Sequence, residues 1–297
     1  MANFENSDYK CLLTDCLNDA FYSSTSNRGK IAHIRQLAEI IVRKLIDLPS
    51  SESLMLGQKL IKSRIKKLKN STHIQKCINA IIHDDGKSHR GNSCSHTGII
   101  DCIEEKEYHE AHDCLLDLIA CLFINYFEEY PFGSNTLILS NFSLLPPIIR
   151  YKVLKFLYSK NANNLFVIDK LILSMRKSFG IEHTRTWIEN NKEHLNSLYS
   201  SINNSTLPSE YPDSYMISMY DWCKIKIDSS DNYPKMYETI EQAKTVYLEK
   251  NTLYDTSEEV SIFKDLMEFV FLGRNEEPLP IDHEPLYVIC HFTQLSE

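Results

Sequence analysis

The stretch RGNSCSH, residues 90–96, brings an arginine, an asparagine and a histidine within seven positions. A histidine titrates near neutral pH, so His96 is a candidate general acid or base. An arginine presents a planar fork of donors, so Arg90 is a candidate to hold a phosphate while negative charge builds up on it. Asn92 is suited to orienting His96 or contacting the same phosphate. These residue types fit cleavage of RNA without a metal ion.

The same stretch also has a structural interpretation. Gly-Asn is common where a helix ends and the chain turns, and the Ser-x-Ser-His that follows can satisfy open helix ends. The residue types alone leave both interpretations open.

Apolar residues recur at helical spacing on both sides of this stretch. We expect helices over residues 8–22, 27–48, 51–69 and 72–83 before it, and over 104–130 after it, where Pro131 ends the pattern. Further helices are expected to begin at the proline pair 146–147 and to cover residues 164–180, 182–202, 233–250 and 257–273.

The composition favours an all-α protein, because only 8 glycines and 10 prolines interrupt 297 residues. We predict two parts, a helical bundle over residues 1–133 and a second helical region over 134–297. The apolar runs are too short to cross a bilayer, and the first residues lack a secretory pattern. Nine cysteines at irregular spacings fit reduced thiols, so we expect a cytoplasmic protein.

The order of these elements around Gly-Asn-x-x-x-His resembles the HEPN superfamily, in its branch of bacterial domains with that motif. The resemblance covers residues 25–133. It implies a homodimer in which two copies of the motif meet, and a metal-independent endoribonuclease of the toxin or phage-defence kind that leaves 2',3'-cyclic phosphates. Gly91 departs from the polar residue usual after the arginine. The alternative is a non-catalytic dimerisation or adaptor module that binds nucleic acid or a partner protein.

Arg35 and Glu39 lie four positions apart on the helix expected over residues 27–48. They resemble an arginine and a glutamate that recur in this branch, and they would then support the loop that carries His96. The alternative is an ordinary ion pair on a helix surface.

Basic residues are concentrated at the start of the chain, where residues 1–100 hold 15 Lys and Arg against 9 Asp and Glu. Lys59, Lys62, Lys66 and Lys69 form a stripe at helical spacing, which is a candidate surface for the RNA backbone. A solvated helix face has the same pattern.

We expect no metal ion and no cofactor. Cys94, His96, Cys102, His109, His112 and Cys114 fall within 21 residues, but they lack a C-x-x-C pair, and we expect Cys102 and Cys114 to face the core. No Walker loop is present either.

Overall fold

The computed structural model describes residues 3–82, 94, 102–203, 214–229, 240–250, 253 and 256–274 of the chain. Within these residues helices make up almost all of the regular structure, and the one sheet is a hairpin of two short strands. The expected all-α class is therefore confirmed.

The first long helix follows from its capping residue and its apolar spacing. Ser26 accepts a hydrogen bond of 3.3 Å from the backbone N–H of Gly29 and so caps the helix. Ile31, Ile34 and Ala38 are buried along one face, as the sequence pattern predicted. The elements in this part are the 3₁₀ turn η1 (Asn6–Tyr9), α1 (Lys10–Leu17), the π-helical turn η2 (Asn18–Tyr22) and α2 (Asn27–Leu45).

The helix expected over residues 51–69 is wrong in its extent. Only α3 (Lys59–Ile65) is helical there. Gly57 has φ +95°, a backbone conformation that glycine adopts readily, so the chain turns just before α3. Leu54 and Leu56 still reach the core from this non-helical segment, which explains the apolar pattern. The next helix is α4 (Ser71–Ile82).

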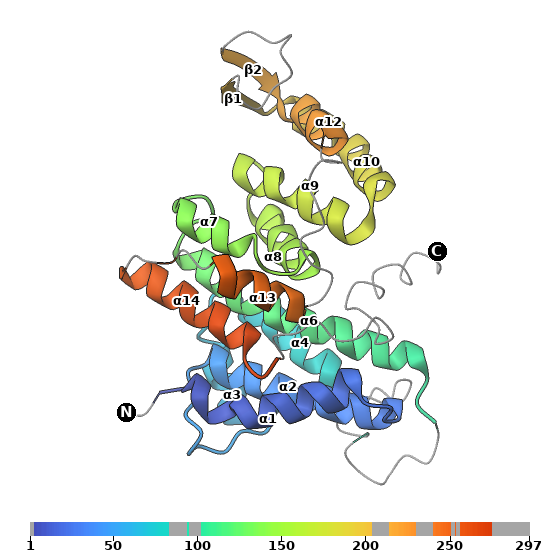
Figure 1. Ribbon diagram of the computed structural model, residues 1–297, viewed down its shortest axis with the longest axis vertical. Helices are drawn as coiled ribbons and strands as arrows, with labels where there is room; N and C mark the ends of the chain where they lie inside the picture. Colours follow the sequence, from blue (N-terminus) through green and yellow to red (C-terminus); the bar gives the residue numbers. More distant parts are fainter. Residues whose placement is uncertain are drawn as a thin grey trace.

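The helix α6 (Glu105–Glu129) is the centre of the fold. Its start is fixed by a capping box, in which Glu107 accepts a hydrogen bond of 3.1 Å from the backbone N–H of Glu104. Among the described helices, those with extensive contacts to α6 are α2, α4, α8 (Pro147–Lys160) and α14 (Glu258–Phe271) (Figure 1). These contacts explain why so much of α6 is apolar.

The second half of the chain continues as helices, and Pro147 stands at the first position of α8 as predicted. Figure 1 shows α9, α10 and α12 stacked at the end of the molecule away from α1 and α2. The elements are α7 (Thr136–Phe142), α9 (Leu165–Phe179), α10 (Ile181–Asn190), α11 (Lys192–Asn196), α12 (Met219–Ser229) and α13 (Ile240–Lys250).

The helix expected over residues 182–202 is wrong at its C-terminal end. β1 (Tyr199–Asn203) pairs with β2 (Ser214–Ser218) in an antiparallel hairpin, with Tyr199 opposite Ser218. The end of the expected helix is rich in serine and asparagine, which are poor helix formers, so strand pairing satisfies its backbone instead.

Buried apolar side chains form two clusters. The larger cluster contains residues from η1 to α9 and from α13 and α14. The smaller cluster lies among α9, α10, α11 and α12 and includes Ile172, Ile188 and Cys223. The division of the chain after residue 133 stays a prediction, and the larger cluster contains side chains from both sides of it.

The helix α14 packs beside the first elements of the chain. Asn6 donates a hydrogen bond of 2.9 Å to the carboxylate of Asp265 on α14. Gly273, just after α14, has φ +74°, and a Cβ atom there would lie 2.8 Å from the backbone nitrogen of Thr14. Only glycine fits this close approach, which joins the end of α14 to α1.

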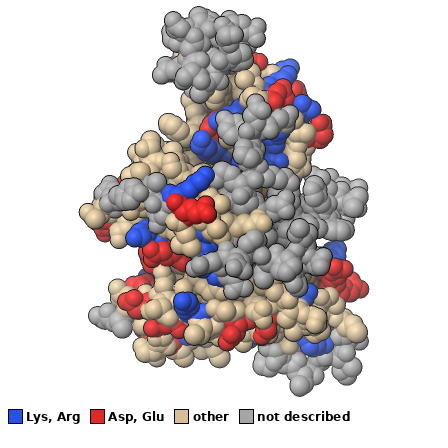
Figure 2. All heavy atoms as spheres, viewed as in Figure 1, with Lys and Arg blue, Asp and Glu red and all other residues tan. Residues whose placement is uncertain are grey.

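The described surface carries charges of both signs. On the face drawn in Figure 2, basic and acidic side chains are interspersed among the described residues. None of the described helices is long and apolar enough to span a membrane.

Candidate functional site

Arg90, Asn92 and His96 lie outside the described residues, so their geometry stays a prediction. The segment that contains them, residues 83–101, connects the end of α4 to the approach to α6. Cys94, two positions before His96, is described, and with 7% exposure it belongs to the larger core cluster. One side chain within the motif is therefore buried in the core.

The start of α2 lies against the start of α6, where residues 83–101 rejoin the described chain. Asn27 donates a hydrogen bond of 3.2 Å from Nδ2 to the carbonyl oxygen of Ile103. One turn further along α2, Lys30 Nζ lies 5.0 Å from the centroid of the Tyr108 ring. These contacts fix the approach to α6 against α2.

Arg35 and Glu39 form an ion pair on α2, with Nη2 and Oε1 3.4 Å apart. Their side chains are only 20% and 25% exposed, so the pair is more buried than a usual surface pair. Burial raises the pKa of Glu39, against the opposing charges of Arg35 and Arg43. Their predicted role beneath the His96 loop depends on residues outside the described ranges.

The four lysines of the predicted stripe are all exposed. Lys59 and Lys62 lie on α3, whereas Lys66 is its C-cap and Lys69 follows in a turn. Lys69 Nζ donates a hydrogen bond of 3.2 Å to the carbonyl oxygen of Glu128 at the end of α6. Because α3 is short, these lysines do not continue along a single helix, and the ammonium group of Lys69 already has a partner.

A buried histidine on α6 was not expected from the sequence. His112 is 1% exposed, and its ring lies between Phe21 and Tyr108, with centroid distances of 5.1 and 6.1 Å. Neither ring nitrogen has a hydrogen-bond partner in the part of the chain that the structure describes. Burial first, then the charge of His109, lowers the pKa of His112 to about 3. This histidine is therefore neutral at pH 7.

The cysteines differ in part from expectation. The eight cysteines within the described ranges form no disulfide with one another, and Cys121 is buried. Cys102 is exposed and Cys114 is only half-buried, so the expectation that both face the core is wrong for Cys102. Cys102 lies just before the first turn of α6.

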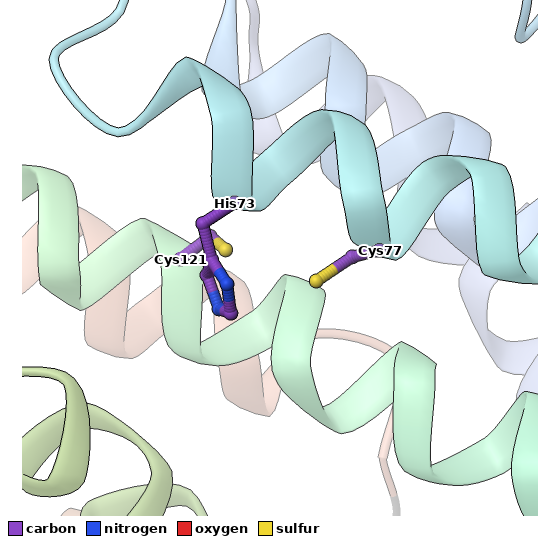
Figure 3. Close-up of side chains that lie close together, drawn as sticks. All are labelled: His73, Cys77 and Cys121. Atoms are coloured by element: carbon purple, nitrogen blue, oxygen red, sulfur yellow. The ribbon is translucent and has the colours of Figure 1, made fainter.

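A different group of metal-ligand residues does come together. His73, Cys77 and Cys121 offer one nitrogen and two sulfur atoms that all lie within 4.8 Å of one another (Figure 3). The sequence analysis missed this group, because Cys121 is 44 positions from Cys77 and becomes a neighbour only through helix packing. The spacing His-x-x-x-Cys on α4, which places both side chains on one helix face, was the available signal.

No family model matches the sequence, and comparisons with curated proteins and with solved structures also find no match.

Proposed function

We propose that the chain is a metal-independent endoribonuclease of the toxin or phage-defence kind. It acts as a homodimer, with Arg90 on the phosphate, Asn92 assisting, and His96 as general acid or base. The observation that supports this most is the setting of the motif. Residues 83–101 connect α4 to α6, which pack against each other, and α2 contacts both helices. Cys94, within this segment, is buried in the larger core cluster, so the motif is attached to the core at that residue.

The chemistry proceeds as a transfer within the RNA. His96 removes the proton of a ribose 2'-hydroxyl, and the resulting oxygen attacks the adjacent phosphorus. The bond from phosphorus to the 5'-oxygen breaks, and that oxygen takes a proton from a protonated imidazole. Arg90 stabilises the charge that collects on the phosphate oxygens. The products are a 2',3'-cyclic phosphate and a 5'-hydroxyl, and no metal ion takes part.

Two copies of the motif at a dimer interface would supply two imidazoles, one to accept the proton and one to donate it. The exposed lysines Lys59, Lys62, Lys66 and Lys69 supply positive charge for the RNA backbone. Arg35 and Glu39 belong to the supporting layer of the proposed site.

The test is cleavage of RNA by the full chain in EDTA, with analysis of the 3' ends and of the oligomeric state by light scattering. We expect cyclic phosphates from the wild type, and a loss of at least about a hundredfold in Arg90→Ala and His96→Ala, because one catalytic group typically contributes that much. Arg185→Ala and His183→Ala are matched controls on α10 and should retain cleavage.

Other results would reject the ribonuclease. RNA binding without cleavage in a folded dimer, unchanged by His96→Ala, would favour the adaptor module instead, since an adaptor needs no titrating group. Equal loss in His183→Ala and His96→Ala would assign the effect to folding rather than chemistry.

A further inference from the structure

We propose that His73, Cys77 and Cys121 bind one Zn²⁺ ion between α4 and α6. The inference rests on the mutual proximity of one imidazole nitrogen and two thiol sulfurs from two packed helices. It is independent of the proposed ribonuclease site, which needs no metal ion.

The helices place the three ligands without distortion of the backbone. His73 and Cys77 are one turn apart on α4, so their side chains project from the same face. Cys121 projects from α6, and Figure 3 shows all three side chains in the space between the two helices. Each ligand is therefore carried by a regular element rather than by a loop, which limits its movement.

The separations are close to those of a zinc site. With Zn–S bonds near 2.3 Å and Zn–N bonds near 2.0 Å, tetrahedral geometry places neighbouring ligand atoms about 3.5 to 3.8 Å apart. The ligand atoms of His73, Cys77 and Cys121 lie within 4.8 Å of one another. A contraction of about 1 Å, which side-chain rotation can supply, would complete the arrangement.

The donor set matches the ion in chemistry and in charge. One imidazole and two thiolates are ligands that zinc prefers, and a three-residue set leaves a fourth position for water or another oxygen. Binding of Zn²⁺ with release of two thiol protons leaves the charge of the site unchanged.

A neighbouring ion-pair cluster lies beside the ligands. Asp117 is one turn before Cys121 on α6, and its charge acts on both His73 and Cys121. Lys152 Nζ on α8 lies 2.9 Å from Asp117 and 2.7 Å from Asp113. Two carboxylates therefore neutralise the one ammonium group, so Lys152 does not leave a net positive charge that would repel a cation.

The site also has an entry path. Cys77 and Cys121 are 5% and 0% exposed, whereas His73 is only half-buried and reaches the surface. An ion can therefore meet the imidazole first and then the two sulfurs. Once bound, the ion would link α4, which precedes residues 83–101, to α6, which follows them.

The experiment uses the reduced full-length protein, freed of metal by a chelator and titrated with Co²⁺ as a spectroscopic substitute for Zn²⁺. We expect a thiolate-to-cobalt charge-transfer band that saturates at one ion per chain and disappears when Zn²⁺ is added. Cys77→Ser and Cys121→Ser should weaken Co²⁺ binding by more than about a hundredfold, because even outer-shell partners contribute about 10- to 100-fold. Cys223→Ser, a buried thiol in the smaller cluster, is the matched control and should bind as the wild type does.

His73→Gln keeps the test decisive if a cysteine variant fails to fold, because His73 is half-buried and a glutamine is tolerated there more readily. Weaker Co²⁺ binding in this variant, with unchanged circular dichroism, supports the site. The proposal is overturned by the absence of the band in the wild type, by a band that only Cys223→Ser removes, or by mass spectrometry that finds a Cys77–Cys121 disulfide in protein isolated with its thiols blocked.

Discussion

The ammonium group of Lys44, on α2, lies 2.5 Å from the carboxylate of Asp265, on α14. The lysine side chain is 8% exposed and the aspartate side chain 50%. The ammonium group also lies 5.0 Å from the ring centroid of Phe4 and 5.6 Å from that of Phe269. A single cation therefore connects the N-terminal segment, the second helix and the last described helix.

Replacement of this cation should destabilise the fold measurably. Removal of one partner of a fully buried pair costs about 3 to 5 kcal/mol. Asp265 is half in water, so we expect Lys44→Met to lower the free energy of unfolding by only about 1 to 2 kcal/mol. Lys264→Met is the control, because that side chain is exposed and 3.8 Å from Glu268. Urea unfolding of both variants measures the difference. Equal losses of unfolding free energy in the two variants would show that the Lys44 contacts do not stabilise the fold.

Phe263 should be among the most sensitive positions in the core. It is fully buried on α14, with its ring centroid 5.8 Å from Phe123 and 5.1 Å from Tyr126. We expect Phe263→Ala to cost about 3 to 5 kcal/mol of unfolding free energy, as is usual for a large aromatic residue in a core. Phe166→Ala, at a position 56% exposed, should cost less than about 1 kcal/mol. A loss of unfolding free energy in Phe263→Ala as small as that in Phe166→Ala would show that α14 contributes little to the core.

The division after residue 133 can be tested with the fragment 1–133. Phe127 on α6 contacts two residues that lie beyond that boundary, Phe142 and Phe263, with ring-centroid distances of 5.4 and 6.2 Å. The fragment would expose these apolar faces, so we expect it to aggregate or to bind a hydrophobic dye. A monodisperse, cooperatively unfolding fragment would instead establish residues 1–133 as an independent domain.

The buried imidazole of His112 predicts a pH-dependent stability. Its pKa is about 3 in the folded chain against 6.5 for an ordinary histidine, so between these values the unfolded chain binds the extra proton. Stability is therefore complete above about pH 7 and falls as the pH decreases, by about 2 kcal/mol between pH 7 and pH 5. His112→Leu should lose this dependence. Urea unfolding at several pH values compares the two, and parallel pH profiles would contradict the assignment.

Lys152 should contribute to the stability of the fold, because its side chain is only 11% exposed and pairs with two carboxylates. Burial tends to lower its pKa, but the charges of Asp117 and Asp113 raise it above the ordinary value, so the ammonium form is favoured in the folded chain. In Lys152→Met the 27%-exposed Asp117 side chain would lose its partner. We expect the free energy of unfolding to fall by about 2 to 3 kcal/mol, somewhat less than for a fully buried pair. Thermal denaturation measures this loss, and Lys155→Met, at an exposed position on α8, is the control.

Helix positions that depend on local chemistry were predictable from the sequence. Pro131 follows α6 and Pro147 begins α8, and each of these is a signal read within a few residues. Leu54 shows the limit of this approach. It shares helical spacing with Ile61 and Ile65, but it reaches the core from a segment that turns at Gly57, and only the packed structure distinguishes this segment from a helix.

At the candidate sites, too, some contacts were predictable from the sequence and others were not. The ion pair between Arg35 and Glu39 was predictable as the alternative to a role in the site, because an interval of four residues on one helix predicts contact. The proximity of Cys121 to His73 was not predictable, since it depends on how α4 crosses α6. The burial of His112 likewise depends on η2, which brings Phe21 over its ring.

The contact between Asn6 and Asp265 joins residues that are 259 positions apart. During synthesis, the first helices therefore emerge long before α14, which later covers part of them. Such long-range closure is slow compared with the formation of local helices, and apolar faces stay open until it occurs. Until α14 has been synthesised and has packed, α6 therefore lacks one of its neighbours, and the apolar side chains that α14 later covers stay exposed to water.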